Sequence, residues 1–127
     1  MDPAYKDFIG RKGTIIVKLK KALYGCKESG LLWFQTLSSF LSKEGFVANP
    51  YDRCVFNKVE NNHQTTVAVY VDDLFITAHH ADAAEALILS LQNKFKVITI
   101  NRGMQHSYLG MRFVFREDSV EVDMESY

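Results

Sequence analysis

Apolar residues recur with helical spacing in two segments of the chain. The first follows Ser29-Gly30 and ends at Gly45, and the second follows Asp82, which together with Glu85 resembles a capping box. The apolar positions are Trp33, Leu37, Phe40 and Leu41 in the first segment and Ala84, Leu87, Ile88, Leu91 and Phe95 in the second. We therefore predict two amphipathic core helices.

Short runs of β-branched and aromatic residues predict strands between and after these helices. The predicted strands are 14–17, 54–56, 65–71, 74–77, 97–100, 112–115 and 119–123. The polar segment 60–63 suits a hairpin loop, and the alternation in 65–71 predicts that Tyr70 and Asp72 share a face. The pattern favours an α+β fold, with a mainly antiparallel sheet and two helices packed on one face.

Composition restricts the class of protein. A chain of 127 residues with 47% hydrophobic and 13% aromatic residues can bury a core, so we expect one globular domain. It lacks an apolar run of about 20 residues and its N-terminus is polar, which predicts an intracellular, cytoplasmic protein without membrane contact. Cys26 and Cys54 have no Cys-x-x-Cys spacing, so we expect free, buried thiols.

Charge is distributed unevenly although the net charge is zero. Residues 1–30 hold seven basic and three acidic residues, and the rest of the chain holds eight basic and twelve acidic residues. A basic front segment fits local contact with a polyanion, and two solvated faces explain it equally well.

The five residues 70–74, Tyr-Val-Asp-Asp-Leu, are the strongest chemical signal in the chain. Two adjacent acids between apolar strands cluster like charges at a turn, which indicates a cation. Carboxylates are ligands that Mg²⁺ accepts, and a pair of such ions can stabilise the attacking and leaving oxygens of a phosphoryl transfer. A solvent-exposed Asp-Asp turn is the ordinary alternative for the residue pair alone.

Other groups of residues give weaker evidence for a functional site. His79 and His80 are adjacent and are expected to point apart, whereas His63 and His106 have no partner at ligand spacing. Neither a Gly-x-Ser-x-Gly elbow nor a Gly-rich nucleotide-binding loop is present.

Several stretches together resemble the reverse transcriptases of copia-type retrotransposons. That family has Tyr-x-Asp-Asp between apolar strands as its central motif, which 70–73 matches. The further matching stretches are the Lys-Leu-Lys-Lys-Ala-Leu-Tyr-Gly run at 18–25 with Lys27, Trp33-Phe34, Gly45-Phe46, Asp52-x-Cys54-Val55-Phe56 and Tyr108-Leu109-Gly110-Met111. The resemblance covers nearly the whole chain in order.

The resemblance implies a role for each matching residue. Asp72 would be a metal ligand, Asp73 its acidic partner near the primer end, and Tyr70 a contact to primer or template, with Mg²⁺ or Mn²⁺ as cofactor. Tyr24, Gly25 and Lys27 would contact the incoming nucleotide and template. Expected partners are an RNA/DNA primer–template, deoxynucleotides and the remainder of the Pol polyprotein, within a retrotransposon particle.

The chain departs from the family pattern at three positions near the expected nucleic-acid path. Cys26, Glu28 and Leu31 stand where the family usually has Leu, Gln and Arg. The family's first catalytic Asp also has no counterpart, because Asp2 and Asp7 lie outside any apolar strand. The resemblance thus implies one partial domain, 1–127, from the polymerase palm, with most of the fingers and the thumb absent.

Three functions remain open from the sequence. The first is a fragment of an RNA-directed DNA polymerase that is inactive in isolation. The second is a remnant or domesticated palm piece that acts as a binding or interaction module, and the third is an α+β binding module whose acidic hairpin is incidental.

Overall fold

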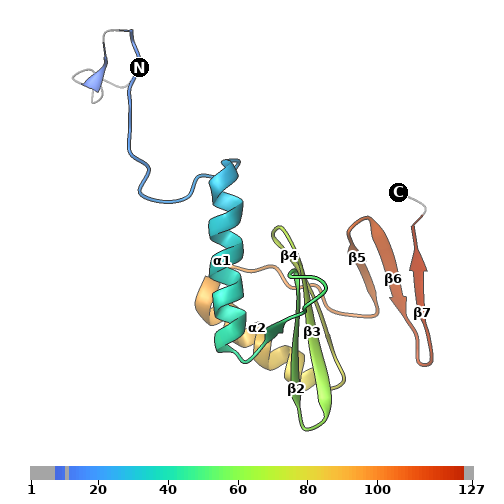
Figure 1. Ribbon diagram of the computed structural model, residues 1–127. Coiled ribbons are helices and arrows are strands. Elements are labelled where there is room, and N and C mark those ends of the chain that lie inside the picture. The colour runs from blue at the N-terminus through green and yellow to red at the C-terminus, as the bar shows by residue number, and fades with distance from the viewer. Residues whose placement is uncertain (1–7, 11, 125–127) are drawn as a thin grey trace. The chain divides into compact units, whose positions relative to one another are not determined.

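A computed structural model describes residues 8–10 and 12–124 of the chain. The chain divides into two compact units, with the boundary between Gln35 and Thr36. Figure 1 labels helices α1 and α2 and strands β2 to β7. Among the described residues, no helix is long and apolar enough to cross a bilayer.

The first unit is largely irregular before its helix. The amide of Gly10 donates to the carbonyl of Thr14 at 2.8 Å, and no strand forms at 14–17. The predicted strand is wrong because no neighbouring strand among the described residues pairs with this backbone, and an isolated strand leaves its peptide groups to water. Ile16 is consequently 95% exposed.

Helix α1 spans Lys27–Lys43, which confirms the predicted helix, and it begins before Ser29-Gly30 rather than after them. Its end is a hydrogen-bonded C-cap. Gly45 has φ +90°, its amide donates to the carbonyl of Ser42, and the amide of Phe46 donates to the carbonyl of Leu41 at 2.9 Å. This pattern satisfies the last carbonyls of the helix and requires a left-handed residue, which explains the glycine.

Four antiparallel strands form the first sheet in the order β1-β2-β3-β4. Their bounds are Val47–Ala48, Val55–Glu60, His63–Tyr70 and Asp73–Ala78. The predicted hairpin at 60–63 is confirmed: Asn61 and Asn62 have φ 50° and 63°, as a two-residue turn with both central residues left-handed requires. Strand β1 was not predicted from the sequence.

One face of this sheet and the two helices share the buried core. Thr65, Val67 and Val69 alternate along β3 and are buried, and Val67 pairs with the buried Phe56 of β2. The remaining buried apolar residues are Leu37, Phe40 and Leu41 of α1, Phe46, and Leu87 and Leu91 of α2, which spans Ala81–Phe95. The predicted α+β architecture with a mainly antiparallel sheet is confirmed.

Helix α2 begins differently from the predicted capping box. His80 occupies the N-cap position without a side-chain cap hydrogen bond, and Asp82 lies inside the first turn. Glu85 instead accepts two hydrogen bonds from the guanidinium of Arg102, at 2.8 and 2.7 Å. The capping-box interpretation is therefore wrong, because Glu85 is paired with a residue distant in sequence.

The second sheet has three antiparallel strands in the order β5-β6-β7, spanning Gln105–Tyr108, Met111–Phe115 and Val120–Asp123. The sequence predicted the last two strands but placed the other at 97–100. This segment is not a strand, and Val97 is 91% exposed. The ring of Phe75, on β4, lies 5.3 Å from the ring of Tyr108 and 5.2 Å from that of Phe113.

Both cysteines are free, as expected. Cys26 and Cys54 are exposed, however, so the expectation that they are buried is wrong.

Candidate catalytic turn

The hairpin between β3 and β4 places the two adjacent acids at its tip. Tyr70 and Asp73 form the last strand pair, which leaves Val71 and Asp72 as a two-residue loop. Val71 has φ 50°, a left-handed conformation that β-branched residues rarely adopt. Backbone conformations of this kind concentrate at functional sites, where the surrounding structure holds them. The sheet therefore holds a strained turn at which both carboxylates are exposed.

The strand register decides which side chains share a face at this turn. Directly paired residues of an antiparallel ladder lie on the same face, so Tyr70 lies beside Asp73. The prediction that Tyr70 and Asp72 continue one strand face is wrong, because β3 ends at Tyr70 and the chain turns before Asp72. Asp73 and Phe75 are two residues apart on β4 and share the face opposite Leu74 and Ile76.

Tyr108 of the second sheet lies within the electrostatic reach of the turn. Partial burial raises the pKa of the Tyr108 phenol, and the negative charge of Asp73 raises it further, followed by Cys54 and Asp52. Its ring also stacks on Phe75. The turn between β5 and β6 is consequently next to the acidic hairpin, an arrangement that the sequence did not predict.

This raised pKa makes the stability of the fold depend on alkaline pH. The folded state keeps the Tyr108 proton to a higher pH than the unfolded chain, whose tyrosines titrate near pH 10. The stabilisation that protonated Tyr108 gives the folded state is therefore complete below about pH 10. It is lost as pH rises through the pKa of Tyr108 in the folded state. We expect Tyr108→Phe to reduce the fall in unfolding free energy between pH 8 and 10.5, measured by urea denaturation.

Tyr51 supplies the matched control for that measurement, since its side chain is 98% exposed. Tyr51→Phe should leave the pH dependence of the unfolding free energy as it is in the wild-type chain. An equal change in both variants would show that the position of Tyr108 beside the acidic turn is irrelevant to its titration.

The donor set of the turn fits a hard divalent cation. Asp72 and Asp73 offer carboxylate oxygens, which Mg²⁺ and Mn²⁺ prefer, and both are open to solvent and to a phosphate-bearing substrate. Two carboxylates supply only part of an octahedral shell, so water and substrate phosphates must complete it.

No third acid joins this pair in residues 8–10 and 12–124. The group of three or more His, Cys, Asp or Glu close enough to share an ion in that part of the chain consists of His63, His79 and His80. Asp2 and Asp7, which the sequence offered as upstream acids, lie outside the described residues. The turn thus presents two adjacent acids without a third among the described residues.

The other candidate binding residues belong to the first unit. Tyr24 is 92% exposed, and Gly25 has φ +86° immediately before α1. Lys27 is the first residue of that helix and is exposed. The structure therefore leaves all three accessible to a ligand, and their contact with nucleotide or template stays a prediction.

The sequence matches a known family profile. The family described as "Reverse transcriptase (RNA-dependent DNA polymerase)" matches residues 6–127. This range contains the Asp72–Asp73 turn and both sheets.

Relatives with similar sequences come from Saccharomyces cerevisiae. The Transposon Ty1-DR1 Gag-Pol polyprotein is 31% identical over 117 residues, which cover 87% of this chain and 6% of the polyprotein. The Truncated transposon Ty1-A Gag-Pol polyprotein is 31% identical over 107 residues, which cover 80% of this chain and 9% of that protein. The chain thus spans less than a tenth of these relatives, and no solved structure matches it.

Proposed function

The chain belongs to the family of reverse transcriptases (RNA-dependent DNA polymerases), and from this we propose that it supplies the metal-binding turn of a copia-type retrotransposon polymerase. In this proposal Asp72 and Asp73 hold two divalent ions, Mg²⁺ or Mn²⁺, at the tip of the β3–β4 hairpin. The observation that carries the proposal is the exposed pair of carboxylates on a strained two-residue turn.

The positions of the side chains support a division of roles at this turn. Two bound ions supply charge stabilisation to the attacking and leaving oxygens when a primer 3′-hydroxyl attacks the α-phosphate of a deoxynucleotide. Asp72, in the loop, ligates metal directly. Asp73 begins β4 beside Tyr70, and in this proposal Asp73 is the acidic partner near the primer end while the half-exposed ring of Tyr70 contacts primer or template.

Residues of the first unit are proposed to act on the nucleotide and template. Lys27 neutralises phosphate, the left-handed Gly25 allows close approach of the backbone, and the exposed ring of Tyr24 can stack on a base. The partners of the whole enzyme are a primer–template, deoxynucleotides and the rest of the polyprotein, inside the cell in a retrotransposon particle.

The isolated chain is proposed to be catalytically inactive. A two-metal site needs carboxylates that bridge both ions, and among the described residues Asp72 and Asp73 have no third acid beside them. With only two acids at the turn, we propose that other parts of the polyprotein supply the remaining ligands of the metal site. The count of two acids equally supports the second candidate, a palm-derived piece that binds a partner and catalyses nothing.

Metal binding at the turn is the direct test of the proposal. Mn²⁺ should bind the chain weakly at Asp72 and Asp73 and broaden the nuclear magnetic resonance signals of residues 70–75, because two carboxylates fill only part of the shell. Asp72→Asn/Asp73→Asn should lose this broadening.

Asp118→Asn serves as the control, since Asp118 is exposed between β6 and β7 and lies outside the hairpin. Its spectrum should broaden at residues 70–75 as the wild-type spectrum does. Equal broadening of residues 70–75 in the double variant would show that the turn is not the metal site.

A further inference from the structure

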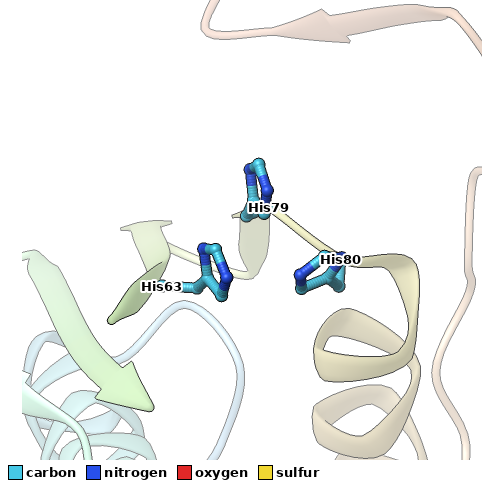
Figure 2. A group of neighbouring side chains, drawn as sticks. All are labelled: His63, His79 and His80. Carbon is cyan, nitrogen blue, oxygen red and sulfur yellow. The ribbon is translucent and has the colours of Figure 1, made fainter. Parts of the chain in front are cut away.

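Three histidines from two segments of the chain meet at the end of β3 and β4 that is far from the acidic turn. His63 is the first residue of β3, and His79 and His80 connect β4 to α2. The antiparallel register explains the meeting: Thr65 pairs with Ala78, so continuing the ladder brings position 63 opposite position 80. We call His63, His79 and His80 the histidine cluster, and Figure 2 shows their three side chains gathered at this end of the hairpin.

The geometry of the histidine cluster is close to that of a metal site. Ring centroids lie 4.3 Å apart for His63 and His79, 4.7 Å for His63 and His80, and 4.5 Å for His79 and His80. One ligand atom from each residue lies within 4.8 Å of the other two. Two imidazoles bound to one tetrahedral Zn²⁺ have nitrogens roughly 3.3 Å apart, given Zn–N bonds of about 2.0 Å.

Only side-chain rotation separates the observed arrangement from a closed site. The rings of His63 and His79 are parallel within 8°, so one of them must turn before both can direct a nitrogen at the same ion. His79 and His80 lie in an exposed connection, which leaves their side chains room for that rotation.

The chemistry of the histidine cluster selects a different ion from that of the acidic turn. Three imidazole nitrogens suit Zn²⁺, Cu²⁺, Ni²⁺ or Co²⁺, whereas Mg²⁺ prefers oxygen. A ligating imidazole must be neutral, so metal binding at the cluster competes with protonation of the rings. His63 and Tyr70 are seven positions apart on β3, so the two sites are roughly 23 Å apart along the strand.

We propose that His63, His79 and His80 form a binding site for one divalent transition-metal ion of the Zn²⁺ class, with the remaining coordination position open to water. Bound metal would join the start of β3 to the β4–α2 connection and stabilise that end of the sheet. This site goes beyond the proposed polymerase function and does not depend on it, because Asp72 and Asp73 take no part.

Binding can be measured on the untagged 127-residue chain after chelator treatment. In isothermal titration calorimetry with Zn²⁺, the wild-type chain should bind one equivalent, and Zn²⁺ should raise its melting temperature until EDTA is added. His63→Gln and His79→Gln should each weaken binding by about tenfold to a hundredfold or more, because loss of a mere supporting contact already costs that much.

His106→Gln is the matched control. His106 is the fourth histidine of the chain, and its Nε2 lies 2.9 Å from the carbonyl oxygen of Gly103, outside the cluster. This variant should bind Zn²⁺ as the wild-type chain does. Circular dichroism of each variant establishes that the fold is retained, and His80→Gln provides an independent third test of the cluster.

A spectroscopic measurement separates imidazole from thiol ligation, since Cys26 and Cys54 are exposed and also able to bind Zn²⁺. The Co²⁺ complex should show visible d–d absorption without the near-ultraviolet charge-transfer bands of a thiolate ligand. Absence of Zn²⁺ binding, unchanged affinity in His63→Gln and His79→Gln, or thiolate bands that persist in the wild-type Co²⁺ complex would each overturn the proposal.

Discussion

Asp72→Ala, introduced into a polymerase that carries this segment together with its polyprotein neighbours, should lower the rate of primer extension on the order of a thousandfold. The residue is placed at the tip of the hairpin with its carboxylate exposed, where it would ligate metal. Metal-ion stabilisation of transition-state charge contributes several kcal/mol, and about 1.4 kcal/mol corresponds to each tenfold change in rate. Single-nucleotide incorporation on a primed RNA template, followed by gel electrophoresis, measures the effect.

Two comparisons make that result specific. Asp118→Ala removes an exposed acid outside the hairpin and should retain near wild-type extension. The isolated 127-residue chain, given primed template, deoxynucleotides and Mg²⁺, should extend no primer above background. If the isolated chain does extend a primer and Asp72→Ala abolishes that activity, the count of two acids is wrong and a third lies within this sequence.

Leu41→Ala should lower the free energy of unfolding by about 2 to 5 kcal/mol, the range measured when a buried leucine leaves a cavity. Leu41 is fully buried, and its carbonyl accepts the hydrogen bond from the Phe46 amide that closes α1. Domains of this size are stable by only about 5 to 15 kcal/mol, so the loss is a large part of the total. Urea denaturation followed by circular dichroism measures it.

Leu31→Ala is the control in the same helix, because it makes the same chemical change at a side chain that is 59% exposed. Its expected effect is within about 0.5 kcal/mol of zero, as for most surface substitutions. Comparable losses in both variants would indicate that helix propensity, rather than burial in the core, determines the cost.

Features encoded by neighbouring residues were predictable from the sequence. Both helices follow from apolar spacing, and Gly45 marks the end of α1 because only a residue that tolerates positive φ closes that cap. The β2–β3 hairpin follows from the polar segment 60–63, and the β3–β4 hairpin follows from the two acids that interrupt an apolar run. The positive φ of Val71 could not be predicted from the sequence, because turn positions with positive φ usually hold Gly, Asn or Asp and not a β-branched residue.

Structural features that depend on contacts between residues distant in sequence could not be predicted from the sequence. A β-branched run such as 14–17 becomes a strand only beside a partner, and Glu85 pairs with Arg102 through tertiary placement. His63 was expected to lack a partner, yet the register of β3 with β4 brings it to His79 and His80, which is a correction to that expectation. Tyr108 beside Asp73 likewise depends on how β5 and β6 approach β4.

The local connectivity of the strands has a consequence for how the chain acquires its structure. Each strand of both sheets pairs with its neighbour in sequence, and the turn between β3 and β4 contains two residues. Closing such short loops costs little chain entropy, and an isolated hairpin forms in about 1 to 10 μs. Ribosomes add about 5 to 20 residues per second, so translation is far slower than this. We therefore expect the acidic hairpin to form during translation, soon after residue 78 leaves the ribosome.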